Sequence, residues 1–190
     1  MSRLPYLRRD DLDEKGIEVW ESVSRTRGGT AVNDDGGLVG PFNAFLHAPE
    51  VGARLSDLGA YLRFGTSVPR RTLELVIITV GAHWKAEFEW WAHARMAREA
   101  GVPDAVVDAI GAGAEPPFDT DDDRVLHALA RQLVESGRID DSTYQAAERI
   151  VGHRGLVELV ALCGYYTLIS FILNGFDVPL PPDAPRQWPG

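Results

Sequence analysis

The sequence predicts an all-α fold, a compact multi-helix bundle, from two observations. Apolar residues recur at helical spacing along most of the chain, and no alternating strand pattern of useful length is present. Glycine, proline and aspartate stand at the ends of these periodic segments, where helices stop and start. The chain has 190 residues, of which 45% are hydrophobic, so it is long enough to bury one sizeable core. We therefore expect a single domain over residues 1–190.

The first 112 residues are expected to form six helices separated by turns. These helices span about 12–25, 42–47, 50–64, 69–84, a segment that ends at Ala100, and 103–112. Ser67 is a candidate cap for the fourth helix, whose first turn tolerates Pro69. Gly101 suits a left-handed cap after the fifth helix. Residues 28–40 carry five glycines and no periodicity, so we interpret them as a loop that forms a mobile flap.

The second half of the chain is expected to be helical up to Gly175. Thr120 is a candidate N-cap, and the aspartates at 121–123 suit the positive end of the helix dipole. Helices are expected over 121–137, 141–151 and 155–174. Apolar residues wrap most of the last one, which predicts either a central helix or a subunit contact. The tail at 176–190 contains five prolines, so it should be extended and strapped across a neighbouring subunit.

Composition and charge argue against several classes of protein. The chain has 19 basic and 28 acidic residues, and its net charge of −9 disfavours binding to nucleic acid or to an anionic membrane. Cys163 is the only cysteine, so no internal disulfide can form, which fits a reducing cytoplasm. The chain start lacks an apolar run of signal-peptide length. The apolar segment 156–173 contains Glu158 and other polar residues, so we interpret it as a buried core helix rather than a membrane span.

Three side chains between residues 74 and 93 are candidates for acid–base chemistry. Glu74 stands in an otherwise apolar helix, where a carboxylate is costly to bury without a partner. Glu89 and His93 are four residues apart, so they share one face of the next helix, and the rest of that face is small or apolar. A histidine beside a carboxylate can take and return a proton near neutral pH. If Glu74 reaches the same pocket, one carboxylate becomes a candidate acid and the other a candidate base.

Other interpretations of these residues stay open. A Glu–His pair at this spacing is often an ordinary surface pair. Two side chains at helical spacing are a weak signature for a metal site, so neither a metal nor another cofactor is expected. Glu87 is interpreted as solvated, and the thiol of Cys163 as buried and inert. The tryptophans and the remaining histidines are assigned to packing or to the surface: Trp84, Trp90, Trp91, His47, His127 and His153.

The segment 60–112 combines Glu74 with the run Glu89-Trp90-Trp91-Ala92-His93 and the sequence Ala94-Arg95-Met96-Ala97-Arg98-Glu99-Ala100-Gly101. This combination resembles the carboxymuconolactone decarboxylase and alkylhydroperoxidase AhpD-like superfamily. The segment 40–50 and the Leu-Cys-Gly-Tyr-Tyr run resemble flanking elements of the same family. The resemblance implies an all-helical fold and a homo-oligomer, either a trimer or a hexamer.

The resemblance also implies which chemistry to expect. The peroxidase branch of the family uses a Cys-x-x-Cys-x-x-x-His motif with an upstream Glu; Glu74 and His93 match the Glu and the His. Ala86 and Glu89 occupy the two cysteine positions, so disulfide chemistry lacks its sulfur. The decarboxylase branch carries Glu-x-x-x-His, which Glu89 and His93 match. That branch releases carbon dioxide from a carboxylated muconolactone without a cofactor.

The leading hypothesis is therefore a cofactor-free acid–base enzyme acting on a small unsaturated or lactone-type carboxylic acid. In it, His93 donates the proton, Glu89 orients His93, and Glu74 is a second acid–base group. Arg70 or Arg71 would anchor the acid group of the substrate. One alternative is a peroxiredoxin-like or alkylhydroperoxidase-like antioxidant. Another is a non-catalytic protein that binds a small ligand or acts as a scaffold.

Overall fold

The computed structural model describes residues 2–27 and 31–188, and its regular structure is helical. The α-helices are α1 (Glu14–Thr26), α2 (Pro41–Phe45), α3 (Pro49–Phe64), α4 (Arg70–His83), α5 (Glu87–Glu99), α6 (Asp104–Ala112), α7 (Asp121–Ser136) and α8 (Asp141–Gly175). A short 3₁₀-helix, Arg9–Asp11, precedes α1. Within the described residues, β-type pairing is limited to two isolated bridges, Arg8 with Gly37 and Val32 with Leu38. The predicted all-α class is confirmed.

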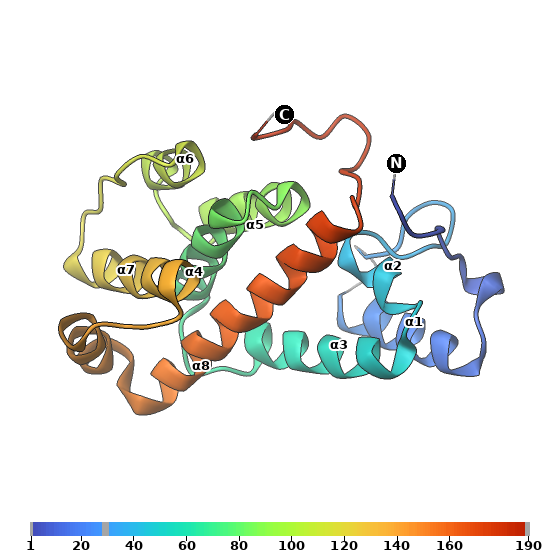
Figure 1. Ribbon diagram of the computed structural model, residues 1–190, viewed down its shortest axis with the longest axis horizontal. Helices are drawn as coiled ribbons and strands as arrows, with labels where there is room; N and C mark the ends of the chain where they lie inside the picture. Colours follow the sequence, from blue (N-terminus) through green and yellow to red (C-terminus); the bar gives the residue numbers. More distant parts are fainter. Residues whose placement is uncertain (1, 28–30, 189–190) are drawn as a thin grey trace.

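The helix α8 runs through the centre of the molecule (Figure 1). It crosses the view diagonally, with α4 to α7 on one side and α1 to α3 on the other. Leu159 and Leu162 on this helix are completely buried. By length and composition α8 could cross a membrane, but more than half of its most apolar window is buried inside the molecule. It is therefore a core helix, as the apolar pattern predicted.

Gly152 divides α8 into two helical stretches. Its φ of 67° and ψ of 174° interrupt the helical backbone, and glycine adopts such a conformation without the clash that a Cβ would cause. The predicted separation of 141–151 from 155–174 is thus correct, with a kink in place of a longer connection.

Glu158 on α8 ties the core helix to the turn between α3 and α4. Its carboxylate accepts hydrogen bonds from the backbone N–H of Ser67 at 2.8 Å, the Ser67 hydroxyl at 2.7 Å, Tyr61 at 3.1 Å and Arg154 at 2.9 Å. Burial acts to raise the pKa of Glu158, but these hydrogen bonds outweigh it and hold the pKa at about 2. The prediction that Ser67 caps α4 is wrong, because its hydroxyl donates to this distant carboxylate and Pro69 occupies the cap position.

Two other predicted helix ends are confirmed. The Thr120 hydroxyl accepts a hydrogen bond from the backbone N–H of Asp123 at 3.2 Å, at the start of α7. Gly101 follows α5 with a φ of 92°, in the left-handed region. Arg71 then binds the Asp123 carboxylate through two hydrogen bonds of 2.6 and 2.7 Å, which joins α7 to α4.

The segment between α1 and α2 is anchored where the structure describes it. Leu38 is completely buried, and the side-chain oxygen of Asn33 accepts a hydrogen bond from the backbone N–H of Gly37 at 3.0 Å. Trp20 donates from its indole to the carbonyl of Gly36 at 3.0 Å. Part of residues 31–40 is therefore anchored to the core, whereas Asp34 and Asp35 are exposed, and the mobility of the segment stays a prediction. The remaining part of the predicted flap, 28–30, lies outside the described residues.

The first residues of the chain bind the end of α8, where the C-terminal tail begins. The backbone N–H of Arg3 donates to the carbonyl of Phe176 at 2.8 Å. Its guanidinium donates to the carbonyl of Gly175 at 3.0 Å and pairs with Asp177 at 2.7 Å. The start of the chain and the start of the tail therefore hold each other.

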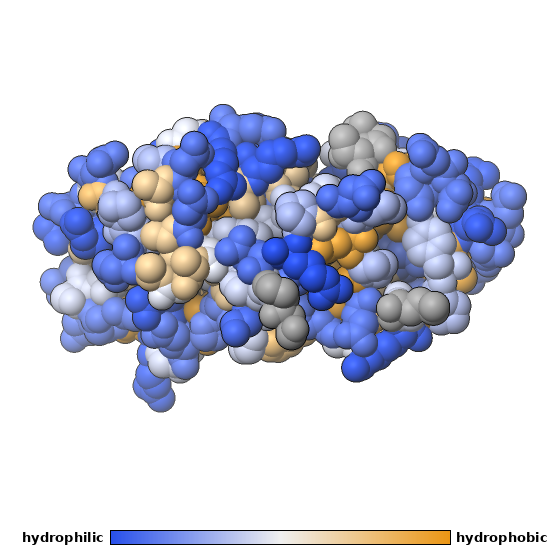
Figure 2. All heavy atoms as spheres, turned by 90° about the horizontal axis from the view of Figure 1, so that it is seen from above, coloured by the Kyte–Doolittle hydropathy of each residue, from blue (hydrophilic) through white to orange (hydrophobic). Residues whose placement is uncertain are grey.

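The far end of the tail packs against its own chain. Both carboxylate oxygens of Glu87, in the first turn of α5, accept backbone hydrogen bonds, from Gln187 at 2.9 Å and Trp188 at 2.8 Å. Glu87 is therefore half-buried rather than fully solvated, and its carboxylate holds the tail on its own chain. A contact of the tail with a neighbouring subunit stays a prediction. Figure 2 shows the molecule from above, where hydrophilic residues dominate and hydrophobic residues form smaller patches between them.

Candidate functional site

The helices α4 and α5 bring Glu74, Glu89 and His93 together. A short turn through Lys85, whose φ is 48°, connects the two helices and lets them pack against each other. Nδ1 of His93 lies 2.7 Å from Oε2 of Glu74, and Nε2 lies 3.0 Å from Oε1 of Glu89. The imidazole therefore stands between carboxylates from two helices. The structure brings these three candidates together, while their part in a reaction stays a prediction.

The three side chains are almost completely buried, with exposed fractions of 2% for Glu74, 4% for Glu89 and 6% for His93. This burial contradicts the alternative of an ordinary surface pair. Burial acts to lower the pKa of His93, but the charge of Glu89 and the hydrogen bond with Glu74 outweigh it and raise that pKa. Burial acts to raise the pKa of Glu74, but the hydrogen bond with His93 and the charges of His93 and Arg63 lower it. The cluster therefore favours a protonated ring beside an ionised Glu74.

One oxygen of this cluster lacks an aligned hydrogen bond. Glu89 Oε1 is buried and accepts no hydrogen bond within the part of the chain that the structure describes; its contact with His93 is an ion pair without hydrogen-bond geometry. A buried acceptor without a donor costs about 1–3 kcal/mol, and such atoms are found at functional sites. This unmatched acceptor makes Glu89 a candidate functional residue. Among the described residues, no group of His, Cys, Asp and Glu side chains has metal-site geometry.

A cavity of about 620 Å³, which we call the His93 cavity, lies beside the cluster. Glu89 and His93 form part of its wall, whereas Glu74 borders an adjoining cavity of about 200 Å³. Much of the remaining wall is aromatic or apolar: Phe42, Phe64, Phe88, Trp91, Met96, Tyr165, Tyr166 and Ile169. A space of this size and lining accommodates a small organic molecule.

Two tyrosines of α8 stand beside the imidazole in this cavity. The ring of Tyr166 meets that of His93 edge to face, with centroids 5.1 Å apart, and Tyr165 meets Tyr166 at 5.3 Å. Any side chain at Gly59 of α3 would collide with the Tyr165 hydroxyl, so glycine is required for this close approach. Burial raises the pKa of Tyr165 to about 12. Its hydroxyl therefore stays protonated at neutral pH and can donate a hydrogen bond.

Two arginines give the His93 cavity a positive wall. The guanidinium carbons of Arg63 and Arg27 lie 5.3 and 5.7 Å from the ring centroid of Phe64. Burial lowers the pKa of Arg27, and the charge of Arg63 lowers it further. Two cations that destabilise each other are both stabilised when an anion binds near them. The cavity therefore suits an organic anion.

The predicted anchors, Arg70 and Arg71, are placed differently from each other. Arg71 donates to Asp123 and, at 3.0 Å, to the carbonyl of Gly101, so it does not line the His93 cavity. Arg70 does line the cavity, and its Nε lies 3.9 Å from Glu74. The sequence pattern did not indicate Arg63, which lies 3.5 Å from Glu74. The one feature of the sequence that could have indicated Arg63 is its position next to the buried face of α3.

Cys163 is buried in α8, and its thiol is expected to be unreactive in the folded protein. Its exposed fraction is 3%, and burial raises its pKa to about 12. Because the thiolate is the nucleophile, an aromatic disulfide reagent should label the folded chain far more slowly than the chain unfolded in guanidinium, which should react once. The released thiolate can be followed by absorbance. Rapid stoichiometric labelling of the folded protein would contradict this expectation.

The bundle around α8, with its buried Glu–His–Glu cluster, defines an all-α protein of AhpD-like fold. A peroxidase-related protein with an alkylhydroperoxidase AhpD core from Ralstonia eutropha JMP134 superposes with a TM-score of 0.77 at 12% identity, over 96% of this chain and 93% of that chain. A peroxidase-related protein from Silicibacter sp. TM1040 gives 0.74 at 13% identity, over 96% and 93%. The debrominase Bmp8, as an alanine variant bound to 2,3,4-tribromopyrrole, gives 0.73 at 13%, over 96% and 95%.

Comparison of the sequence with family models identifies a family within this fold class. Residues 49–132 match the model of the carboxymuconolactone decarboxylase family, and this match includes the three clustered side chains. The predicted resemblance to the carboxymuconolactone decarboxylase and AhpD-like superfamily is therefore confirmed. None of the curated proteins matches the chain.

Proposed function

We propose that this chain is a cofactor-free acid–base enzyme that removes carbon dioxide from a small lactone-type or unsaturated carboxylic acid. The observation that carries the proposal is the buried imidazole between two carboxylates in the wall of a cavity with cationic side chains. The same cluster without a cysteine offers no sulfur for a peroxidase cycle, since Cys163 is buried with a strongly raised pKa. The match to the decarboxylase family model supports this choice.

The reaction asks the site for two things. As the bond between carbon and the leaving carboxylate breaks, its electron pair moves into the conjugated system and onto a carbonyl oxygen. Arg27 and Arg63 are proposed to stabilise the negative charge that develops there, with the Tyr165 hydroxyl as a further donor. A proton must then reach carbon, so that a carboxylate and a proton become carbon dioxide and a C–H bond.

The geometry suggests a different order of proton donors from that predicted. Both ring nitrogens of His93 already face carboxylates, so we propose that the ring supplies a proton to Glu89 rather than directly to substrate, after a small reorientation that aligns their 3.0 Å contact. Glu89, which lines the cavity, is proposed to deliver that proton to the substrate. Glu74 lies behind the ring and is proposed as a positioning residue that keeps it charged and oriented.

The test uses 4-carboxymuconolactone at neutral pH with no added metal or cofactor. We expect release of one carbon dioxide per substrate consumed and, in heavy water, one deuterium bound to a carbon of the conjugated system that received the electron pair. Muconolactone without the extra carboxyl group is the matched control and should release none. Binding of the carboxylated lactone without turnover would contradict catalysis and would favour the alternative of a ligand-binding protein.

We further propose that the chain works in the cytoplasm as a homo-oligomer, a trimer or hexamer. A stripe of exposed apolar side chains along α8 supports contact with another copy. The stripe comprises Val157, Val160, Leu168 and Phe171, with exposed fractions of 70%, 42%, 38% and 54%. A single buried thiol fits a reducing compartment. The expected partners are thus a small-molecule substrate and further copies of the chain, rather than nucleic acid or a membrane.

A further inference from the structure

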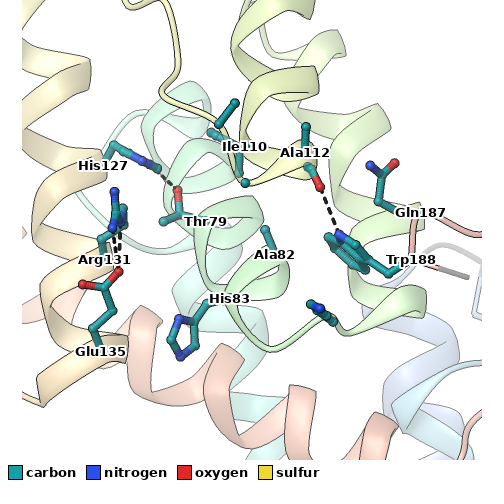
Figure 3. A pocket seen from close by; sticks show the side chains of 14 residues that line it. Thr79, Ala82, His83, Ile110, Ala112, His127, Arg131, Glu135, Gln187 and Trp188 are labelled. Carbon is teal, nitrogen blue, oxygen red and sulfur yellow. Dashed lines mark hydrogen bonds and ion pairs between the residues drawn. The ribbon is translucent and has the colours of Figure 1, made fainter. Parts of the chain in front are cut away.

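A second cavity, which we call the tail cavity, lies between α4, α6 and α7 (Figure 3). Its volume is about 470 Å³, and the tail residues Gln187 and Trp188 close one side of it. Trp188 donates from its indole to the carbonyl of Gly111 at 3.0 Å and packs on Trp90 with centroids 5.3 Å apart. Any side chain at Gly111 would collide with Trp90 and crowd Gln187. Specific contacts therefore hold this wall in place.

His127 on α7 offers a hydrogen-bond acceptor at the tail cavity. Its ring lines the cavity with an exposed fraction of 7%, and Figure 3 shows it directed at Thr79. Nδ1 lies 2.9 Å from the Thr79 hydroxyl, which donates its single proton to the carbonyl of Leu75 at 2.8 Å. Nδ1 must therefore carry the proton and donate to that hydroxyl, which leaves Nε2 with a lone pair. Among residues 2–27 and 31–188, no side-chain hydrogen bond involves Nε2, and this atom is not fully buried, so a molecule in the cavity can reach it.

The ring of His127 is neutral at physiological pH. Burial lowers its pKa, and the charge of Arg131 lowers it further to about 4, while Glu135 acts in the opposite direction. The ring of Phe118, 5.2 Å away between centroids, covers it without adding charge. Nε2 therefore remains an acceptor, and a ligand that displaces solvent from it binds better when it donates a hydrogen bond to it.

The remaining wall of the tail cavity combines positive charge with an apolar surface. Lys85 lies in the turn between α4 and α5. On α7, Arg131 binds Glu135 at 2.8 Å, and the two are drawn joined in Figure 3, so their charges offset each other. Lys85 thus leaves the cavity with one excess positive charge. Apolar surface comes from Ala82, Ile110 and Trp188.

We propose that the tail cavity binds a small organic acid that also carries a hydroxyl group. The hydroxyl donates to Nε2 of His127, the carboxylate pairs with Lys85, and the apolar body of the ligand packs against Trp188. Neither group belongs to the Glu–His–Glu cluster or lines the His93 cavity. The inference therefore stands or falls independently of the proposed decarboxylation.

The test is isothermal titration calorimetry of the full chain with two probes, 4-hydroxyphenylacetate and phenylacetate. They differ only by the hydroxyl, so we expect the first to bind at least about tenfold more tightly, because it alone can donate a hydrogen bond to Nε2 of His127. His127→Phe should abolish that difference. Lys85→Gln, at an exposed position, should weaken both probes several-fold while their ratio is kept.

A matched control separates the two cavities. Arg63→Gln changes the His93 cavity only, and it should leave both affinities unchanged. Circular dichroism verifies that His127→Phe is folded, and Lys85→Gln provides an independent measurement if it is not. Equal affinities of the two probes, no binding of either, binding unaffected by Lys85→Gln, or loss of binding in Arg63→Gln would each overturn the proposal.

Discussion

Replacing Glu89 with glutamine is expected to lower the turnover number on the carboxylated lactone by about 10²–10⁴-fold. Glutamine has the size of glutamate and keeps an acceptor oxygen, but it cannot pass on a proton. Because Glu89 is proposed to act in proton transfer rather than in holding the substrate, KM should change much less than kcat. Steady-state kinetics of carbon dioxide release, with the folded state verified by circular dichroism, measures both parameters.

The chain offers a matched control for this substitution in a second Glu–His pair. Glu148 lies 2.6 Å from His153, whose side chain is 79% exposed, and neither residue lines the His93 cavity. Glu148→Gln should leave turnover unchanged. If the proton passes from His93 to Glu89, a variant with both His93 and Glu89 replaced should be little slower than a variant with only one of them replaced. Full turnover in Glu89→Gln would remove Glu89 from the mechanism.

Replacing Glu74 with alanine is expected to lower the free energy of unfolding by about 3–5 kcal/mol. This carboxylate is 2% exposed, hydrogen-bonds His93 at 2.7 Å and lies 3.5 Å from Arg63, so its removal leaves buried positive charge without its partner. Urea unfolding followed by tryptophan fluorescence measures the change. Glu21→Ala removes half of an exposed pair with Arg9 and should cost at most about 1 kcal/mol. Equal losses in the two variants would contradict the argument.

The stability difference between the wild type and Glu74→Ala should depend on pH. Because the pKa of Glu74 is lowered from 4.5 on folding, its contribution is complete above that ordinary value and is lost as the pH falls through the lower folded value. The pKa of His93 is raised from 6.5, so its contribution is complete below that value and is lost as the pH rises through the higher folded value. The difference should be largest between these ordinary values, and a pH-independent difference would contradict the ion-pair explanation.

Local patterns predicted the parts of the fold that depend on neighbours in sequence. Thr120 and Gly101 have the expected roles because capping is decided within one helical turn. The spacing of Glu89 and His93 placed them on one face of a helix for the same reason. The approach of Glu74 followed from the cost of burying a carboxylate without a partner.

Contacts between residues far apart in the chain could not be predicted in this way. Ser67 has a common capping side chain, but Glu158, 91 positions later, competes for its hydroxyl. Arg27 reaches the His93 cavity from the end of α1, and no periodicity within α1 indicates that. His127 resembled a structural histidine in the sequence; only the hydrogen bonds of Thr79 show which of its nitrogens is an acceptor. Such assignments require the packing of whole helices.

The contacts of Arg3 with the end of α8 make the two ends of this chain depend on each other. Proteolytic trimming ahead of Leu4 would release the carbonyl of Phe176 and the carboxylate of Asp177, from which the tail departs. The loosened tail would then weaken the packing of Trp188, near the C-terminus of the sequence. Loss of the N-terminal residues would therefore weaken the packing of the C-terminal ones.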